Sequence, residues 1–202
     1  MYSQWTRQVF CVAAFAVAFL KSDVAAKCPS LPDQRSEFVK TKFNPALLTG
    51  IWYEHRYIDI AQIGSECQLL NGTYAANSLA MDFSVKYDGI PFTIVELYNE
   101  TKVPGYYIKR AKMPGSKLLE FPTVVVDVKE PADGTDYTRL TMSSCVMKLD
   151  LPITELVFAT RVKNESQAVI EEMEAVARKQ GVEWNEKELK TVDWTKPACA
   201  NL

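Results

Sequence analysis

The chain contains a single histidine, His55, among 202 residues. Histidine is the side chain that most often serves as a general base near neutral pH and that activates a nucleophilic serine or cysteine. The sequence also has no glycine-rich phosphate loop and no pair of cysteines in CxxC spacing. The sequence therefore lacks the residues and motifs that acyl transfer, metal-assisted hydrolysis and nucleotide chemistry require. We expect a protein that is not an enzyme and requires no cofactor or metal.

Two remaining candidates for catalysis have simpler explanations. His55 stands between Tyr53 and Tyr57 in a predicted strand, where a lone histidine most often packs or faces solvent. Three carboxylates that could pair as acid and base share a predicted exposed helix face, where solvation is the default: Glu171, Glu172 and Glu174.

The chain also lacks an excess of basic residues. Lysine and arginine number 23 against 25 aspartate and glutamate, and the lysines are scattered among the acidic residues. A nucleic-acid-binding protein shows a basic stripe or a strongly basic balance. We therefore exclude nucleic acid as a partner.

Long apolar runs are missing except near the N-terminus. Arg7 precedes the run Val9 to Leu20, and small residues follow at Val24-Ala25-Ala26. The run is about a dozen residues long, whereas a helix needs roughly 20 to cross a bilayer. We interpret residues 1–26 as a signal peptide, so Cys11 leaves with it, and we expect an exported extracellular protein without a transmembrane segment.

Residues 27–202 have the length of one ordinary domain, which can bury roughly 70% of its unfolded surface. No linker, repeat or low-complexity segment divides them. Loss of Arg7, Lys21 and Asp23 with the signal peptide changes the net charge from −2 to −3. We therefore predict a single, mildly acidic domain.

Four cysteines remain after export, and an even number in an oxidising compartment predicts two disulfides, each contributing about 2 to 4 kcal/mol. Three pairings are open for Cys28, Cys67, Cys145 and Cys199. Three Asn-x-Ser/Thr sequons agree with export, at Asn71, Asn99 and Asn164. We favour glycans at the first two, because Asn164 precedes a helical pattern and could instead be its N-cap.

From residue 49 to residue 161 the chain reads as short β segments separated by turn signals such as Asp88-Gly89 and Pro104-Gly105, which is typical of an antiparallel meander closed as a barrel or sandwich. The predicted strands are 50–58, 67–76, 79–87, 92–99, 106–112, 117–121, 123–128, 136–145 and 155–162. The pattern then changes to a helical period over 165–180, with one apolar stripe formed by Val169, Met173, Val176 and Ala177. We expect one helix outside the sheet.

The segment Gly50-Ile51-Trp52-Tyr53-Glu54 resembles the G-x-W motif of the lipocalin family. The order around it is also similar: Cys28-Pro29 ahead, Cys67 in the second strand, Cys145 in the seventh, Arg161 ending the eighth, then a helix and Cys199 in the tail. This order, over essentially all of residues 27–202, resembles the lipocalins that include apolipoprotein D and the insect bilin-binding members. It implies an eight-stranded antiparallel up-and-down barrel with one C-terminal helix packed outside.

The resemblance also implies roles for single residues. It pairs Cys28 with Cys145 and Cys67 with Cys199, and places the Arg161 guanidinium over the Trp52 indole at the barrel base, where a cation–π contact is worth about 0.5 to 2 kcal/mol. Gly50, Trp52 and Arg161 are then structural. The second family motif, Thr-Asp-Tyr, has two candidates: Asp127 within 126–128, and Thr135-Asp136-Tyr137. Residues 129–134 look like an insertion, and 67–98 is longer than two strands need, so an extra hairpin or an overlong strand would fit.

Side chains alternate across a strand, so parity predicts the barrel lining. We expect Asn99, Asn71, Cys67 and Cys145 to face outward. Alternation from these positions places the following side chains inward as pocket residues: Leu70, Tyr74, Phe92, Ile94, Glu96, Tyr98, Leu140 and Met142, with Gln68 beside them. From an inward Trp52, parity places Glu54 and Arg56 inside and His55 and Tyr57 outside. Two buried opposite charges are costly unless paired, and a β-bulge would reverse every assignment beyond it.

A closed eight-stranded barrel has room for one small ligand in a mostly apolar pocket. The resemblance implies a secreted carrier that binds a small hydrophobic molecule noncovalently, of the bilin, retinoid, sterol or fatty-acid class. The alternative is a secreted interaction or inhibitor protein that keeps the barrel as a scaffold, with a cell-surface receptor or a second copy as its partner. A carrier keeps an open cavity, whereas a scaffold fills its barrel with large side chains.

Overall fold

The computed structural model describes residues 27–76, 78–115, 120–130 and 134–200. The predicted signal peptide lies outside these residues, as do 117–119 of the predicted strand 117–121. Within the described ranges, every helix is too short or too polar to cross a membrane.

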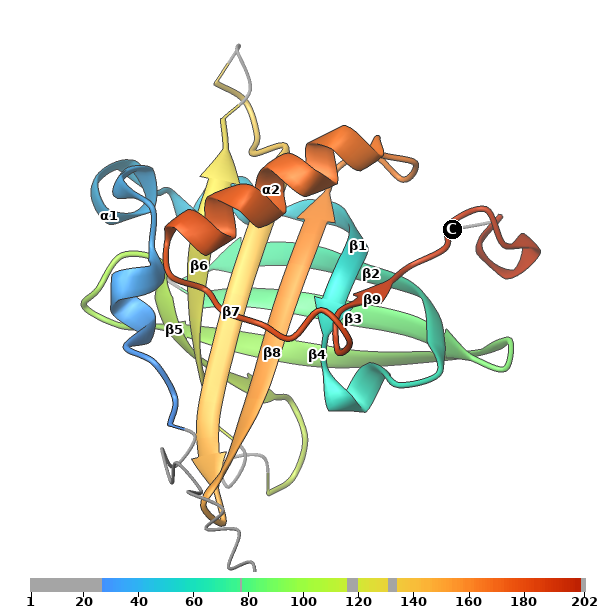
Figure 1. Ribbon diagram of the computed structural model, residues 1–202, viewed down its shortest axis with the longest axis horizontal. Coiled ribbons are helices and arrows are strands. Elements are labelled where there is room, and N and C mark those ends of the chain that lie inside the picture. Colours follow the sequence, from blue (N-terminus) through green and yellow to red (C-terminus); the bar gives the residue numbers. More distant parts are fainter. Residues whose placement is uncertain (1–26, 77, 116–119, 131–133, 201–202) are drawn as a thin grey trace, which may run out of the picture.

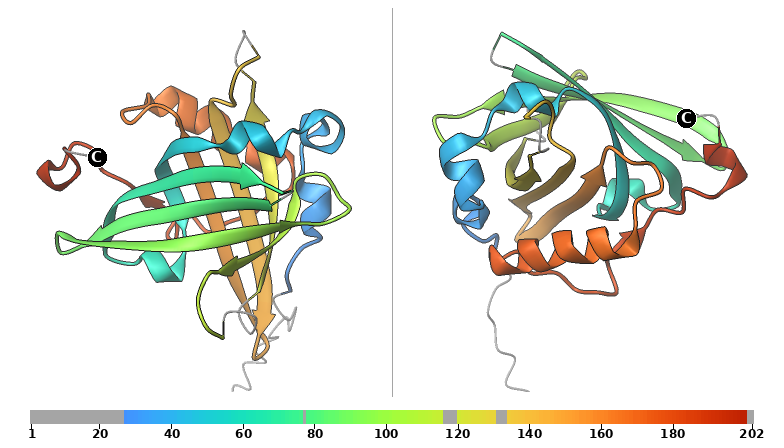
Figure 2. Two further views of the ribbon diagram at one scale, coloured as in Figure 1. Left: turned by 180° about the vertical axis from the view of Figure 1, so that it is seen from behind. Right: turned by 90° about the horizontal axis from the view of Figure 1, so that it is seen from above.

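Eight antiparallel strands form a closed barrel, because β1 is hydrogen-bonded to β2 on one side and to β8 on the other. Figure 2 shows the ring of strands from above. The strands are β1 (Gly50–Ile58), β2 (Ser65–Ala75), β3 (Ser78–Tyr87), β4 (Ile90–Glu100), β5 (Tyr106–Ala111), β6 (Phe121–Lys129), β7 (Arg139–Lys148) and β8 (Leu151–Thr160). The predicted fold class is confirmed.

The strand boundaries show where the local signals were correct. The β3–β4 hairpin turns at Asp88-Gly89, both with positive φ (50° and 81°), as a two-residue turn of this sequence requires. Three long strands occupy the stretch whose strand count was open, 67–98. The β7–β8 turn lies at Leu149-Asp150, where two non-glycine residues take positive φ, so β7 and β8 extend further toward that turn than predicted.

The helix α2 (Gln167–Lys179) lies across the outside of β6, β7 and β8, as Figure 1 shows. Its N-cap is Ser166, whose hydroxyl accepts a hydrogen bond from the Val169 backbone N–H; Asn164 does not cap it, which corrects that alternative. The side chains that it buries are Ile170, Met173 and Ala177, which pack against the outer faces of β6 and β8. Ile170 was missing from the predicted stripe, so the buried face is rotated slightly from the predicted one.

An N-terminal arm crosses the barrel base in three short helices, η1 (Leu31–Gln34), α1 (Glu37–Lys42) and η2 (Pro45–Leu48). Their caps are visible in the sequence: Ser36 caps α1, and Asn44 followed by Pro45 begins η2. The arm lies very close to the barrel at Gly72, where an added Cβ would come within 2.4 Å of the Leu48 carbonyl oxygen. The arm therefore closes one end of the barrel.

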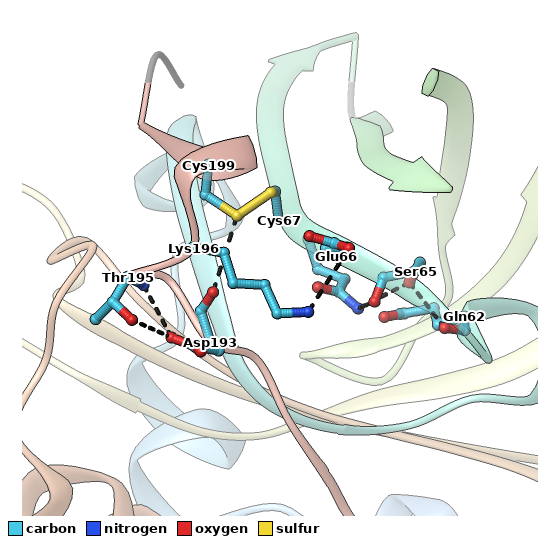
Figure 3. Close-up of polar contacts among 9 residues, drawn as sticks. Gln62, Ser65, Glu66, Cys67, Asp193, Thr195, Lys196 and Cys199 are labelled. Carbon is cyan, nitrogen blue, oxygen red and sulfur yellow. Dashed lines mark hydrogen bonds and ion pairs between the residues drawn. A yellow bond between two sulfur atoms is a disulfide. The ribbon is translucent and has the colours of Figure 1, made fainter. Parts of the chain in front are cut away.

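Two disulfides tie the ends of the chain to the barrel. Cys28 is bonded to Cys145 and Cys67 to Cys199, which confirms the pairing implied by the family resemblance. The tail adds β9 (Lys190–Thr191) beside β1 and a last turn, η5 (Pro197–Cys199). In Figure 3, Lys196 of the tail reaches Glu66 of β2, with 3.6 Å between Nζ and Oε1.

Replacing Cys67 and Cys199 together with serine is expected to lower the free energy of unfolding by about 2 to 4 kcal/mol, because the bridge restricts a long loop of the unfolded chain. Denaturant unfolding measures the loss, with the Cys28–Cys145 bridge left intact. The tail should also become more sensitive to protease. Unchanged stability and unchanged proteolysis would show that other contacts hold the tail without the bridge, such as the hydrogen bond of 2.7 Å from the Trp194 indole N–H to the Glu54 carbonyl oxygen.

Candidate functional site: the barrel interior

A small cavity lies inside the barrel, at the end opposite the N-terminal arm. Its volume is about 20 Å³, which is enough for one group of the size of a water molecule. Its apolar walls are Leu70, Phe83, Met142 and Val157, and its polar lining is Glu54, Asp59, Gln62, Glu96, Tyr98, Lys109, Thr123, Ser144 and Glu155. The interior is therefore narrow and more polar than the predicted apolar pocket.

Lys109 of β5 forms the centre of the polar lining. Its Nζ lies 2.5 Å from Glu155 Oε2 and 3.1 Å from Glu96 Oε1. The Tyr98 hydroxyl donates a hydrogen bond of 2.7 Å to the other oxygen of Glu96. Burial alone would lower the pKa of Lys109, but the charges of Glu155 and Glu96 raise it well above its usual value. The ammonium is therefore charged and shared by two carboxylates.

Glu54 of β1 is the most deeply buried carboxylate in the lining, with 1% of its surface exposed. Its Oε2 atom has no hydrogen-bond partner among the described residues. Burial, followed by the negative charge of Asp59, raises the pKa of Glu54 to about 8. At neutral pH this carboxyl group therefore carries a proton for most of the time.

The β1–β2 loop contributes Asp59 and Gln62 to the cavity lining at the barrel mouth, where it forms η3 (Ile60–Gln62). Asp59 caps this turn by accepting a hydrogen bond of 2.7 Å from the Ala61 backbone N–H. The Tyr57 hydroxyl donates to the Gln62 carbonyl oxygen at 3.2 Å, and the Tyr87 hydroxyl donates to the Ala61 carbonyl oxygen at 2.6 Å. Gln62 is thereby held inward, with 3% of its surface exposed.

The structure distributes the eight predicted pocket residues over three environments. Four of them line the cavity: Leu70, Glu96, Tyr98 and Met142. Leu140 is fully buried in the inner core, and Ile94 and Tyr74 pack against that core, Tyr74 also donating a hydrogen bond to Glu100. Phe92 lies near the end of the β3–β4 hairpin, 47% exposed and against Tyr87, so it does not line the cavity.

A β-bulge in β1 explains the error in the strand-parity prediction beyond Glu54. The register with β8 shifts between Glu54 and Arg56, and this reverses the faces, as one extra residue must. Arg56 therefore lies outside, its Nε 3.2 Å from Glu174 Oε1 on α2, rather than inside as predicted. Tyr57 pairs with Val157, a cavity residue, rather than facing outward.

Sequence reasoning missed Lys109 and Glu155, although a signal for both existed. Lys109 is the cross-strand partner of Tyr98, and Glu155 is the partner of Ser144. Directly paired residues share a face, so an inward Tyr98 and an outward Cys145 would have placed both charges inside once the register was known. The register itself cannot be read from composition.

The three structural motifs meet at the closed end of the barrel. The Arg161 guanidinium carbon lies 3.7 Å from the centre of the Trp52 ring, and the Trp52 indole N–H donates to the Leu48 carbonyl oxygen. Arg161 also donates to four backbone carbonyl oxygens: those of Leu47, Thr49, Ile51 and Tyr137. Gly50 takes a φ of +83° beside Arg161. Tyr137 belongs to the 135–137 candidate for the second motif, which places that candidate at the motif site.

The remaining predicted residues lie away from the cavity. His55 is buried, with its Nε2 3.0 Å from Thr160 Oγ1, and burial lowers its pKa, so it serves packing. Of the three sequon asparagines, Asn71 and Asn164 are exposed, whereas Asn99 is half-buried and donates to the Ile108 carbonyl oxygen. Both sulfurs in the Glu66, Cys67 and Cys199 group are bonded to each other (Figure 3), so they offer no thiolate to a metal.

Comparison with known proteins identifies the fold. No family model and no curated protein matches the chain. Lobster apocrustacyanin A1 is 13% identical, with 83% of this chain and 88% of that chain covered and a TM-score of 0.63. Insecticyanin from the tobacco hornworm Manduca sexta is 12% identical, with 78% and 84% covered and a TM-score of 0.59.

A third similar structure is the siderocalin Ex-FABP, which functions through dual ligand specificities. It is 12% identical, with 72% of this chain and 93% of that chain covered and a TM-score of 0.54. All three proteins are lipocalins. The chain has the lipocalin fold, in agreement with the resemblance of its motifs, while the closer resemblance to apolipoprotein D stays a prediction.

Proposed function

We propose that this chain is a secreted carrier that binds one small ligand noncovalently inside the barrel. The proposal rests on the cavity itself, a space inside the barrel where four apolar side chains meet a larger set of convergent polar groups, which can fix the orientation of a bound ligand. At about 20 Å³ the space holds only a small group of a ligand. Binding of a whole molecule therefore requires the β1–β2 loop to move outward.

One experiment tests export and carriage together. The full chain is expressed in a eukaryotic cell, and the protein in the medium is examined by native mass spectrometry and an absorbance scan without delipidation. We expect an N-terminus at Lys27, glycan mass at Asn71 and a bound small molecule, whose visible absorbance would identify a bilin. Retention in the cell, or an empty protein whose tryptophan fluorescence is not quenched by retinol, would count against carriage.

The alternative is a secreted interaction or inhibitor protein that uses the barrel as a scaffold, and two observations favour it. Side chains leave little space inside the barrel. Large apolar side chains are exposed on the β1–β2 loop and the β7–β8 hairpin, with Ile60 73% and Leu149 97% exposed. A second copy or a receptor could contact them. The mass spectrum distinguishes the two functions, because only a carrier releases a small molecule.

A further inference from the structure

Two buried oxygen atoms of the cavity lining have no hydrogen-bond partner among the described residues. They are Oε2 of Glu54 and Oε1 of Gln62, on side chains that are 1% and 3% exposed. A buried acceptor without a partner costs about 1 to 3 kcal/mol, so buried polar atoms are nearly always satisfied. Both atoms belong to residues that line the same water-sized space. Gln62 Oε1 is an acceptor at any pH, and Glu54 Oε2 becomes one when the carboxyl group loses its proton, so the space is suited to a donor group that displaces the Glu54 proton.

The charges around the space favour a cation. Four carboxyl groups line it, those of Glu54, Asp59, Glu96 and Glu155, against the single ammonium of Lys109. That ammonium is already shared by Glu96 and Glu155. An anionic ligand such as a fatty acid or a bilin would bring its carboxylate into an acidic site whose one cation is occupied. An alcohol would supply one donor and no charge.

We propose that the barrel interior selects a small organic cation, a primary amine whose ammonium group donates hydrogen bonds to Glu54 and Gln62. An ammonium has three donors and no acceptor, and its size matches the space. Once the β1–β2 loop has moved outward, the apolar part of the ligand lies along Leu70, Phe83 and Met142. This inference rests on the proposed ligand-binding function and names the class of ligand.

Binding of such an amine is coupled to a proton. Burial and the charge of Asp59 raise the pKa of Glu54 to about 8, with Glu96 acting in the same direction and Gln62 and Lys109 opposing it. An ammonium beside Glu54 favours the ionised carboxylate, so binding releases this proton. Amine affinity therefore rises between about pH 6 and about pH 8.

The test is isothermal titration calorimetry at about pH 8 with three probes of similar shape: phenethylamine, phenethyl alcohol and hydrocinnamate. We expect the amine to bind at least about tenfold more tightly than the alcohol, and hydrocinnamate to bind most weakly, because charge-assisted hydrogen bonds are roughly twice as strong as neutral ones. Glu54→Gln should weaken amine binding about tenfold and alcohol binding less than about twofold. Glu37→Gln removes an exposed carboxylate from α1 and should change neither.

A second measurement is independent of folding defects in the variants. Titration of the unaltered protein in two buffers with different ionisation enthalpies, at about pH 7, should show proton release on amine binding. Equal affinity for amine and alcohol, or tightest binding of hydrocinnamate, would overturn the inference. If the alcohol or retinol binds but the amine does not, the carrier function stands and the amine specificity fails. If no probe binds, both fail.

Discussion

Replacing Lys109 with methionine is expected to lower the free energy of unfolding by about 3 to 5 kcal/mol at about pH 8, because it leaves buried carboxylates without their shared cation. Glu96 and Glu155 lie 3.1 and 2.5 Å from the Lys109 ammonium. Burial already raises the pKa of Glu155 in spite of that ammonium. Without the Lys109 ammonium, both carboxylates must take up protons or stay ionised in a poorly solvated site. Denaturant unfolding measures the resulting loss in the free energy of unfolding.

Two further variants distinguish the loss of the buried ion pairs from the loss of any lysine. Lys40→Met changes an exposed residue of α1 and should shift stability by less than about 0.5 kcal/mol. Adding Glu155→Gln to Lys109→Met should restore part of the loss, because it removes one unpaired charge. The destabilisation should also shrink at about pH 5, where protons replace the lysine. A loss that is equal at both pH values would mean that Lys109 acts by packing alone.

The fold was predictable because its signals are local. Hydrophobic alternation and turn residues such as Asp88-Gly89 placed most strands within a few residues of their observed bounds. The break predicted between 117–121 and 123–128 is absent, because β6 runs without interruption from Phe121 to Lys129. The pattern alone left a barrel or a sandwich open, and the topology came from the family resemblance carried by the motif around Trp52, by Arg161 and by the cysteine order. The alternation and the turn residues lie in short windows of sequence, so one chain is enough to read them.

The site was less predictable because it depends on register. One bulge after Glu54 turned Arg56 outward, and Lys109 could be placed inside only through its pairing with Tyr98 in another strand. A lysine in a short strand such as β5 would ordinarily be assigned to solvent. Buried charges paired across three strands leave no periodic signal in the sequence. The cavity lining therefore holds more charged groups than the mostly apolar pocket that was expected.

Replacing Glu54 with glutamine is expected to stabilise the protein increasingly as the pH rises. The folded pKa of about 8 lies above the ordinary value of 4.5, so folding favours the protonated carboxyl. The associated stability is fully present below about pH 4.5 and is lost as the pH rises through about 8. Glutamine has no proton to lose, and the free energy of unfolding of Glu54→Gln relative to the unaltered protein should therefore increase by about 3 to 5 kcal/mol between about pH 5 and about pH 9.

Urea unfolding of both proteins across this pH range gives the difference between their free energies of unfolding. The contributions of the other cavity carboxylates are nearly the same in both proteins and largely cancel. Glu37→Gln, with its exposed side chain, should give a difference that is nearly flat with pH. A flat curve for Glu54→Gln would mean that the Glu54 carboxylate is already ionised near neutral pH and solvated within the cavity. Its Oε2 atom would then have a partner in the folded protein, and the main reason for placing an ammonium group there would disappear.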